Sequence, residues 1–130
     1  MTAKKKVLII EDDLFLVQMM QGFLEENGYA VIIAENGAQG LDLIKYEEPH
    51  LILCDRCMPK LSGYFLLEFL RTDYPQYNNI PFIFLTNLVD SRDIEGTLDL
   101  KPTAYLTKPI DSNKLLSIVK SSLSTEHTKT

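Results

Sequence analysis

Four short segments of the chain consist almost entirely of apolar residues, many of them β-branched or aromatic. They are residues 7–10 (VLII), 31–34 (VIIA), 51–54 (LILC) and 82–85 (FIFL), and residues 103–106 (TAYL) form a weaker fifth segment. A strand with one solvated face would alternate apolar and polar side chains, whereas uninterrupted runs of this length are typical of parallel strands covered on both faces. The pattern therefore predicts five parallel strands.

Five further segments repeat apolar residues every three or four positions, which is the spacing of one helix face. Turn and cap residues flank three of them: Gly28 follows the first, Asn36 can cap the second and Pro49 follows it, and either Asp111 or Ser112 can cap the last. The predicted apolar faces contain Leu16, Met20, Phe23 and Leu24; Leu41 and Ile44; Leu66, Leu67 and Leu70; Ile94 and Leu98, after a cap at Asp90 or Ser91; and Leu116, Val119 and Leu123.

Strand and helix alternate five times along the chain. Five such units imply an α/β fold with three layers, in which helices cover both faces of a doubly wound parallel sheet. We expect residues 5–123 to form this domain, residues 1–4 to be an N-terminal tail, and residues 124–130 to be a polar C-terminal tail.

Length, composition and charge exclude several classes of protein. With 130 residues, 45% of them hydrophobic and 24% charged, the chain suits one ordinary domain and leaves no room for a second. The net charge of −5 disfavours direct binding to nucleic acid or to an anionic membrane. No apolar run approaches the ~20 residues of a membrane span or forms a secretory signal. With only two cysteines the chain is no disulfide scaffold, so we expect a cytoplasmic protein without membrane insertion.

Polar side chains follow the predicted strands at the edge where a parallel sheet binds its ligands. Carboxylates that converge there repel each other and raise each other's pKa, and a divalent cation such as Mg²⁺ relieves that repulsion. Carboxylates, Mg²⁺, a hydroxyl and an ammonium group together indicate transfer of a phosphoryl group to or from a carboxylate. The residues that follow the strands are Glu11, Asp12 and Asp13; Asp55; Thr86 and Asn87; and Thr107 and Lys108.

Taken singly, several of these residues have an ordinary structural explanation. For Asp12 or Asp13 alone, capping of the following helix is the better interpretation. Cys54 and Cys57 form a C-x-x-C pair, a spacing found in redox sites and zinc knuckles. A zinc knuckle would need a second pair of ligands, and Cys54 ends an apolar run, so we expect a core cysteine and keep a redox protein as a minor alternative.

In order and spacing, the polar residues resemble those of the receiver domains of two-component response regulators, including small chemotaxis-type receivers. The resemblance spans about residues 5–123. It rests on Asp12-Asp13, on Asp55 with Pro59 and Gly63 after it, on Thr86, and on Lys108-Pro109. It implies a flavodoxin-like (βα)5 fold with strand order 2-1-3-4-5.

The resemblance assigns roles to the acidic residues. Asp55 would be the phosphoacceptor, which receives a phosphoryl group from a histidine kinase or a histidine phosphotransfer protein. Mg²⁺, or Mn²⁺, would bind to Asp13, to Asp55 and to the backbone carbonyl of Cys57, and Asp12 would act through a metal-bound water.

The resemblance also assigns roles to residues on the last two strands. Lys108 and the Thr86 hydroxyl would bind phosphoryl oxygens, and the peptide bond from Lys108 to Pro109 would be cis. Tyr105 would be the switch residue, which turns inward when Thr86 is drawn to the phosphoryl group. The signal would then appear on the surface formed by the fourth helix, the fifth strand and the fifth helix.

Asn87 departs from the usual pattern of the family, and Cys57 and Leu88 occupy two positions that tune the lifetime of the phosphoryl group. The residue after Thr86 is usually small in this family, and the larger Asn87 would narrow access to Asp55. Cys57 and Leu88 occupy positions whose side chains flank the phosphoryl group. Because an apolar Leu88 beside a weakly polar Cys57 would exclude the attacking water, we expect slow self-dephosphorylation.

These observations predict a signalling domain rather than an enzyme that acts on other molecules, because the only reactions implied are its own phosphorylation and dephosphorylation. The expected partners are the phosphodonor protein and a downstream protein target. If these 130 residues are the complete chain, the output must be contact with another protein. Dimerisation on phosphorylation is left open. The alternative is a receiver-fold interaction module that works without phosphorylation.

Overall fold

The structure is a computed structural model that describes residues 3–56, 58, 60–87 and 99–128. The predicted helix that contains Ile94 and Leu98 lies outside these residues. The strands are β1 (Lys6–Ile10), β2 (Ala30–Ala34), β3 (Leu51–Asp55), β4 (Phe82–Thr86) and β5 (Ala104–Thr107). The helices are α1 (Leu14–Glu26), α2 (Gly37–Glu47), α3 (Gly63–Asp73), the short 3₁₀ helix η1 (Pro75–Tyr77) and α5 (Ser112–Thr128).

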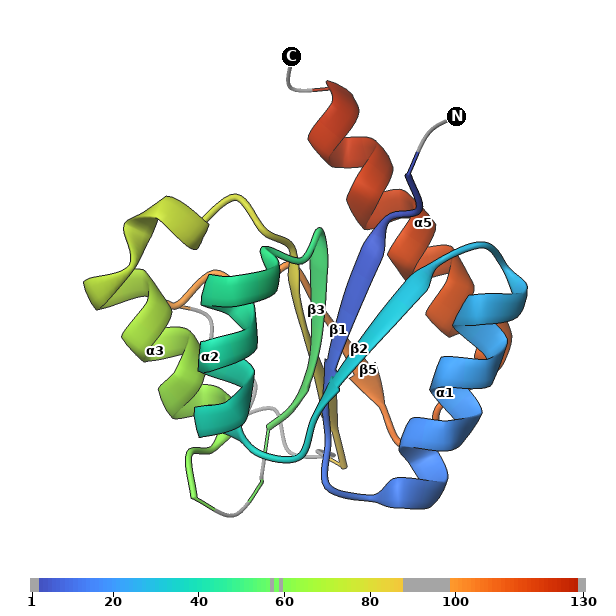
Figure 1. The fold of residues 1–130 in the computed structure, drawn as a ribbon, viewed down its shortest axis with the longest axis horizontal. Coiled ribbons are helices and arrows are strands. Elements are labelled where there is room, and N and C mark those ends of the chain that lie inside the picture. The colour runs from blue at the N-terminus through green and yellow to red at the C-terminus, as the bar shows by residue number, and fades with distance from the viewer. Residues whose placement is uncertain (1–2, 57, 59, 88–98, 129–130) are drawn as a thin grey trace.

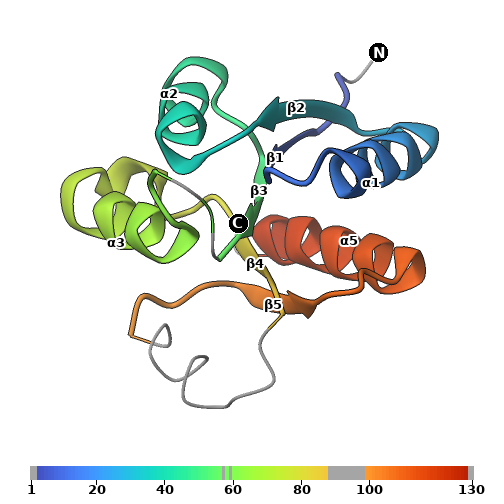
Figure 2. The same cartoon turned by 90° about the horizontal axis from the view of Figure 1, so that it is seen from below.

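The five strands form one parallel sheet in the order β2-β1-β3-β4-β5, as predicted. Helices α1 and α5 cover one face of the sheet, and α2 and α3 cover the other (Figures 1 and 2). The fold is therefore the three-layer, flavodoxin-like arrangement expected from the sequence. The carboxyl ends of the strands lie together at the lower edge of the molecule in Figure 1.

Successive side chains of the central strands point to opposite faces of the sheet and so divide the core into two halves. In β1, Val7 and Ile9 pack with α1 and α5, whereas Leu8 and Ile10 pack with α2 and α3. Strands β3 and β4 alternate in the same way, because successive side chains of a strand point to opposite faces. Both faces of these strands are therefore apolar. The polar residues at the carboxyl ends of the strands are held in place by the buried strands that they follow or end.

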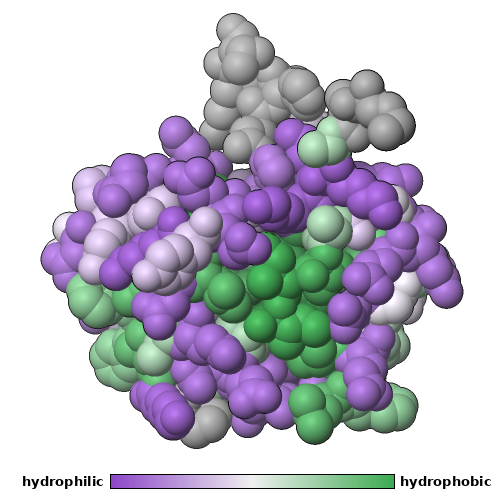
Figure 3. All heavy atoms as spheres, viewed as in Figure 1, coloured by the Kyte–Doolittle hydropathy of each residue, from purple (hydrophilic) through white to green (hydrophobic). Residues whose placement is uncertain are grey.

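Strand β2 lies at the edge of the sheet and is less covered than the central strands. Its residues Ala30–Ile33 are only partly buried, although the sequence predicted coverage on both faces. The space-filling view shows apolar side chains in the middle of the face on which β2 lies, framed by polar residues (Figures 1 and 3). The uninterrupted apolar pattern therefore overstates the burial of an edge strand.

Side-chain caps begin the helices close to the carboxyl edge of the sheet. Asn36 Oδ1 accepts from Gln39 N at 2.9 Å, and Asp111 Oδ1 accepts from Asn113 N at 2.8 Å. Each cap satisfies a backbone donor that the first turn of a helix leaves free. The sequence had identified Asn36 as a cap and had offered Asp111 or Ser112 for the last helix, of which the structure selects Asp111.

Helix α5 differs from its predicted form in two ways. Leu115, rather than the predicted Leu116, is buried, whereas the predicted Val119 and Leu123 both contact the core. The helix also continues to Thr128 and so extends into residues 124–130, which the sequence analysis assigned to a polar tail. Composition alone therefore did not locate the end of this helix.

Gly63, the first residue of α3, lies where a side chain has no room. A Cβ atom built on Gly63 would overlap the backbone carbonyl oxygen of Asp55. Gly63 N also donates to Arg56 O at 3.1 Å. The start of α3 is thus packed directly against the backbone that carries the last residue of β3.

We expect Gly63→Ala to lower the free energy of unfolding by about 1–3 kcal/mol, because the added methyl group must displace backbone atoms. Gly22→Ala is the matched control, since Gly22 lies within α1 and a Cβ there would have no neighbour within 4 Å. That change should stabilise the protein by up to about 1 kcal/mol through helix propensity. Urea denaturation of both variants checks the pair, and equal effects would contradict the packing described for Gly63.

Candidate functional site

Four strand ends bring polar side chains to one point on the carboxyl edge of the sheet. Glu11 follows β1, Asp55 ends β3, Thr86 ends β4 and Lys108 follows β5. Glu11, Asp55 and Thr86 are buried although they are polar or charged. Buried polar groups at the meeting point of several strands are typical of a binding or reaction site in an open parallel sheet.

Lys108 joins two of these strand ends through its ammonium group. Its Nζ atom lies 2.9 Å from Glu11 Oε1 and 3.2 Å from Asp55 Oδ2. Its backbone N–H donates to Thr86 O at 2.7 Å, which fixes the residue beside the end of β4. The peptide bond between Lys108 and Pro109 is cis, as predicted. One cation from the end of β5 therefore links the ends of β1 and β3, which lie on the far side of β4.

Among the acidic residues that the structure describes, Glu11 is the most deeply buried, with 1% of its surface exposed. Its Oε2 atom accepts from the backbone N–H groups of Asp12 and Asp13, both at 3.1 Å. Burial raises the pKa of Glu11 to about 7, although contact with Lys108 and the hydrogen bond from the Asp13 backbone oppose this effect. Glu11 therefore gains or loses its proton near neutral pH.

The Lys108 ammonium is held in its charged form by its neighbours. Burial by itself lowers the pKa of Lys108, but the carboxylates of Glu11 and Asp55 outweigh it and hold the pKa above the usual value. A permanent positive charge beside Asp55 can bind an anionic group that reaches this carboxylate.

Three carboxylates form a group that suits a divalent metal ion. One oxygen from each of Glu11, Asp12 and Asp55 lies within 4.8 Å of the other two. Carboxylate oxygens are the ligands that Mg²⁺ prefers, and it commonly binds through one or two of them while it keeps several waters. Asp12 is exposed and so gives the group an open side for such waters. The chemistry of the group therefore fits Mg²⁺.

Asp13, which was predicted to be a metal ligand, caps helix α1. Its Oδ1 atom accepts from Phe15 N at 3.0 Å and from Leu16 N at 3.3 Å, and the described acidic group contains Glu11 in its place. Because β1 ends at Ile10 and α1 begins at Leu14, Asp13 stands at the cap position and Glu11 directly follows the strand. The sequence signal was present: Glu11 directly follows the apolar run, and Asp13 directly precedes the helical pattern.

Thr86 and Tyr105 lie on neighbouring strands near Lys108. The ladder between β4 and β5 places Tyr105 beside Phe84, and their rings stack with centroids 5.8 Å apart and an interplanar angle of 20°. Thr86 follows Phe84 by two residues, so the hydroxyl and the half-buried Tyr105 ring belong to the same part of the sheet. Asn87 is exposed after β4, and Cys57, Pro59 and Leu88 lie outside the described residues.

Cys54 is a buried, free cysteine of the core. Burial raises the pKa of its thiol well above the usual value, and the charges of Asp55 and Glu11 add to this effect. Because the thiolate is the reactive form, such a thiol is unsuited to redox exchange. The core interpretation of Cys54 therefore holds, and the position of its C-x-x-C partner lies outside the described residues.

None of the described helices combines the length and the apolar character that a membrane crossing requires.

Comparison with known proteins places the chain in a family. The family model for the response regulator receiver domain matches residues 7–120. A probable transcriptional regulator, ycf27 of Cyanophora paradoxa, is 33% identical over 120 residues, which cover 92% of this chain and 48% of the relative. The chain thus spans about half the length of the first curated relatives it matches.

Two solved structures resemble the fold closely. A CheY-like receiver domain protein from Methanospirillum hungatei has a TM-score of 0.88 and 28% identity, with 98% of this chain and 99% of that chain covered. The signal receiver domain of a signal transduction histidine kinase from Syntrophus aciditrophicus has a TM-score of 0.85 and 34% identity, with 92% and 90% covered. Together with the family match, they show that this chain belongs to the response regulator receiver domain family.

Proposed function

We propose that this protein is a phosphorylated switch, in which Asp55 accepts a phosphoryl group from the phosphohistidine of a histidine kinase or a histidine phosphotransfer protein. The observation that carries the proposal is the contact of Lys108 Nζ with Asp55 Oδ2 at 3.2 Å, at the edge where the ends of β1, β3, β4 and β5 meet. A buried carboxylate beside a fixed ammonium group is suited to hold an anion that is transferred to it.

In the transfer, one carboxylate oxygen of Asp55 forms the new P–O bond while the P–N bond to the donor histidine breaks. The donor imidazole leaves with the bonding electron pair. Negative charge spreads over the phosphoryl oxygens during such a transfer, so positioning and positive charge do most of the work. Lys108 supplies one positive charge from the side of β5, and the Thr86 hydroxyl can donate a hydrogen bond from the end of β4.

Glu11, Asp12 and Asp55 would hold Mg²⁺, and the backbone carbonyl of Cys57 would complete the set as the family pattern suggests. Mg²⁺ supplies positive charge that offsets the repulsion between the carboxylates and the incoming phosphoryl group. Glu11 replaces Asp13 in this proposal because Glu11, unlike Asp13, belongs to the described acidic group.

The proposed output is a change at the β4–β5 side of the sheet. When the Thr86 hydroxyl moves toward a phosphoryl group on Asp55, it frees space near Phe84, on which Tyr105 stacks. Tyr105 would then turn inward and alter the surface around β5 and α5, which a downstream protein reads. The same change could also favour a dimer, and the phosphodonor protein must approach the edge that carries Asp55.

Incubation with Mg²⁺ and a small-molecule phosphodonor should add one phosphoryl group to the protein, detected as a gain in intact mass. Asp55→Asn should abolish the gain, because an amide is not a nucleophile for this transfer. Asp13→Asn is the matched control: asparagine caps helices as well as aspartate does, so this variant should be phosphorylated normally.

Failure of the wild type to gain mass with small donors and with a cognate kinase would contradict the phosphorylated switch. It would favour an interaction module of receiver fold that works without phosphorylation. Loss of the gain in Asp13→Asn would instead restore Asp13 to the metal site.

We expect Lys108→Met to slow the initial rate of phosphorylation about 100-fold, because it removes a fixed positive charge from beside the transferred group while keeping most of the length of the side chain. Lys114→Met removes an exposed charge from α5 and should leave the rate unchanged. Radiolabel incorporation in the presence of Mg²⁺ measures both rates. Equal rates for Lys108→Met and wild type would show that the contact with Asp55 has no part in the transfer.

Mg²⁺ should bind more tightly as the pH rises from about 6 to about 8. The pKa of Glu11 is about 7 without the metal, so below this pH the site carries one negative charge fewer and the proton competes with Mg²⁺. The dependence approaches about tenfold per pH unit below the pKa and levels off above it. Calorimetric titration of wild type and Glu11→Gln checks this, and an equally steep dependence in the variant would exclude Glu11 as its source.

A further inference from the structure

Helix α3 carries two apolar faces, and the protein core uses only one of them. Leu66, Leu67 and Leu70 are buried in the core half that α2 and α3 share. Phe65 and Phe69 are 56% and 39% exposed. A spacing of one helical turn suits a core face and a partner surface alike. The structure excludes the core for both.

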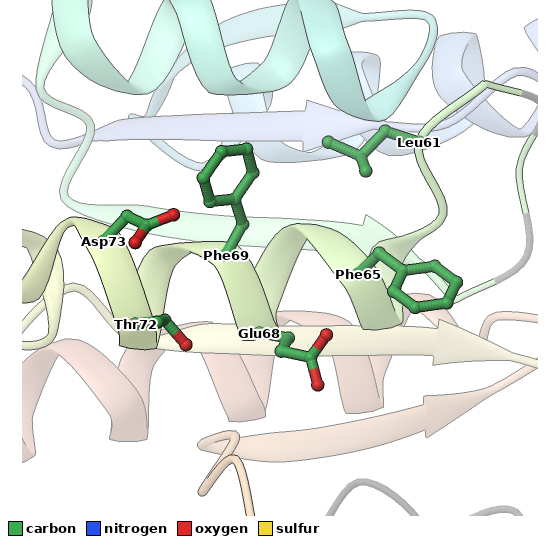
Figure 4. Close-up of a pocket in the computed structure, with 6 residues that line it drawn as sticks. All are labelled: Leu61, Phe65, Glu68, Phe69, Thr72 and Asp73. Atoms are coloured by element: carbon green, nitrogen blue, oxygen red, sulfur yellow. The ribbon is translucent and has the colours of Figure 1, made fainter.

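The second face of α3 is hollowed into a groove, which we call the α3 groove. It has a volume of about 420 Å³. Figure 4 shows Phe65, Glu68, Phe69 and Thr72 on successive turns of the helix, with Leu61 in the segment that leads into it. The lining residues are Leu61, Phe65, Glu68, Phe69, Thr72 and Asp73. A groove along a helix with apolar residues one turn apart is the kind of surface that accepts the side chains of another helix.

At one end of the α3 groove, Phe69 is held by contacts with neighbouring side chains. The Phe69 ring packs on Tyr74 with centroids 5.7 Å apart, and Tyr74 packs on Tyr77 at 6.2 Å. Lys45 Nζ lies 4.6 Å from the centre of the Tyr74 ring. Because these contacts restrict Phe69 before any partner binds, a partner would lose little free energy to ordering this part of the surface.

Arg71 fixes the same helix from another side. Its guanidinium donates to Leu100 O at 2.8 Å, to Lys101 O at 3.1 Å and to Asn78 Oδ1 at 3.3 Å. The positive charge in the last turn of α3 is thus directed away from the groove and toward the segment before β5. The charge of Arg71 therefore does not neutralise the acidic residues that line the α3 groove.

The charged residues among the described lining are Glu68 and Asp73, which are both acidic. Asp73 is the last residue of α3, where the helix dipole adds negative potential. A lining of apolar and acidic side chains is complementary to apolar side chains flanked by lysine or arginine. A second copy of this chain docked groove to groove would place Glu68 and Asp73 against their own equivalents, and like charges disfavour that contact.

We propose that the α3 groove binds an amphipathic helix of another protein, whose apolar side chains one turn apart insert between Phe65 and Phe69 and whose lysine or arginine residues pair with Glu68 and Asp73. The groove lies on α3, whereas the proposed phosphoryl site lies at the carboxyl ends of the strands, so this interaction does not depend on phosphorylation of Asp55. The protein would then have a docking surface in addition to any surface that its switch controls.

The probe is a designed helical peptide longer than the ~15 residues that an isolated helix needs, with leucines one turn apart, lysines beside them and a single tryptophan on the apolar face. The protein contains no tryptophan, so the peptide alone emits on excitation at the red edge of indole absorption. Titration of the peptide with protein at physiological ionic strength should shift this emission to the blue. Wild type and Asp55→Asn should bind alike.

Phe65→Ala and Glu68→Lys should each weaken binding about tenfold or more, as expected for an anchor in the centre of an interface and for a reversed charge. The matched controls are Tyr46→Ala, which removes a ring that is 84% exposed on α2, and Glu26→Lys, which reverses an exposed charge on α1. Both should bind as wild type does. Because all four side chains are exposed, circular dichroism should show each variant folded.

Four results would overturn the proposal. They are the absence of binding, equal affinity for Phe65→Ala and wild type, equal affinity for a peptide whose lysines are replaced by glutamate, and self-association of the wild type that Phe65→Ala abolishes. The last result, measured by sedimentation, would assign the groove to a second copy of the chain. Failure of the peptide to bind leaves phosphorylation of Asp55 unaffected, so this proposal and the proposed function fail separately.

Discussion

The ion pairs of one lysine determine how this site can work. Lys108 Nζ lies within 3.2 Å of carboxylate oxygens from both Glu11 and Asp55, which belong to the ends of different strands. Without a cation these buried carboxylates would repel each other, and burial already raises the pKa of Glu11 to about 7. The site therefore holds negative charge that the Lys108 ammonium and the backbone N–H groups beside Glu11 stabilise. In the proposed mechanism Mg²⁺ and Lys108 share this task, and the incoming phosphoryl group takes over contacts that the lysine makes in its absence.

The fold creates this charge arrangement through its strand order. Strands β1, β3, β4 and β5 are adjacent and parallel, so their carboxyl ends deliver Glu11, Asp55, Thr86 and Lys108 to one edge. The same construction joins the site to α3, because Gly63 begins that helix against the carbonyl of Asp55. Helix α3 then presents Phe65 and Phe69 to solvent on a side that its core leucines do not occupy. One βα unit thus carries the proposed phosphoacceptor at one end and the proposed docking groove on its helix.

Much of the fold could be predicted from the sequence because continuous apolar runs are required by burial, whatever the tertiary detail. The sequence is uncertain where a shift of one residue changes which residue caps a helix or which side chain is buried. Glu11, Asp12 and Asp13 are chemically similar, and only the end of β1 and the start of α1 assign Asp13 to a cap. Leu115 and Leu116 are equally apolar, and only the placement of α5 on the sheet buries Leu115. The helical spacing of Phe65 and Phe69 suits a core face and a partner surface alike, and their exposure in the structure excludes the core.

The central claim is that Asp55 and Lys108 form a phosphoryl site with a metal at the adjacent carboxylates. A crystal structure of the protein with Mg²⁺ and beryllofluoride, a stable mimic of a phosphoryl group, tests it most directly. The account predicts the mimic on a carboxylate oxygen of Asp55, with Lys108 Nζ in contact with it and Mg²⁺ bound by Asp55 together with Glu11 or Asp12. A structure in which Lys108 keeps its contacts with Glu11 and Asp55 while the mimic is absent from Asp55 would contradict the account.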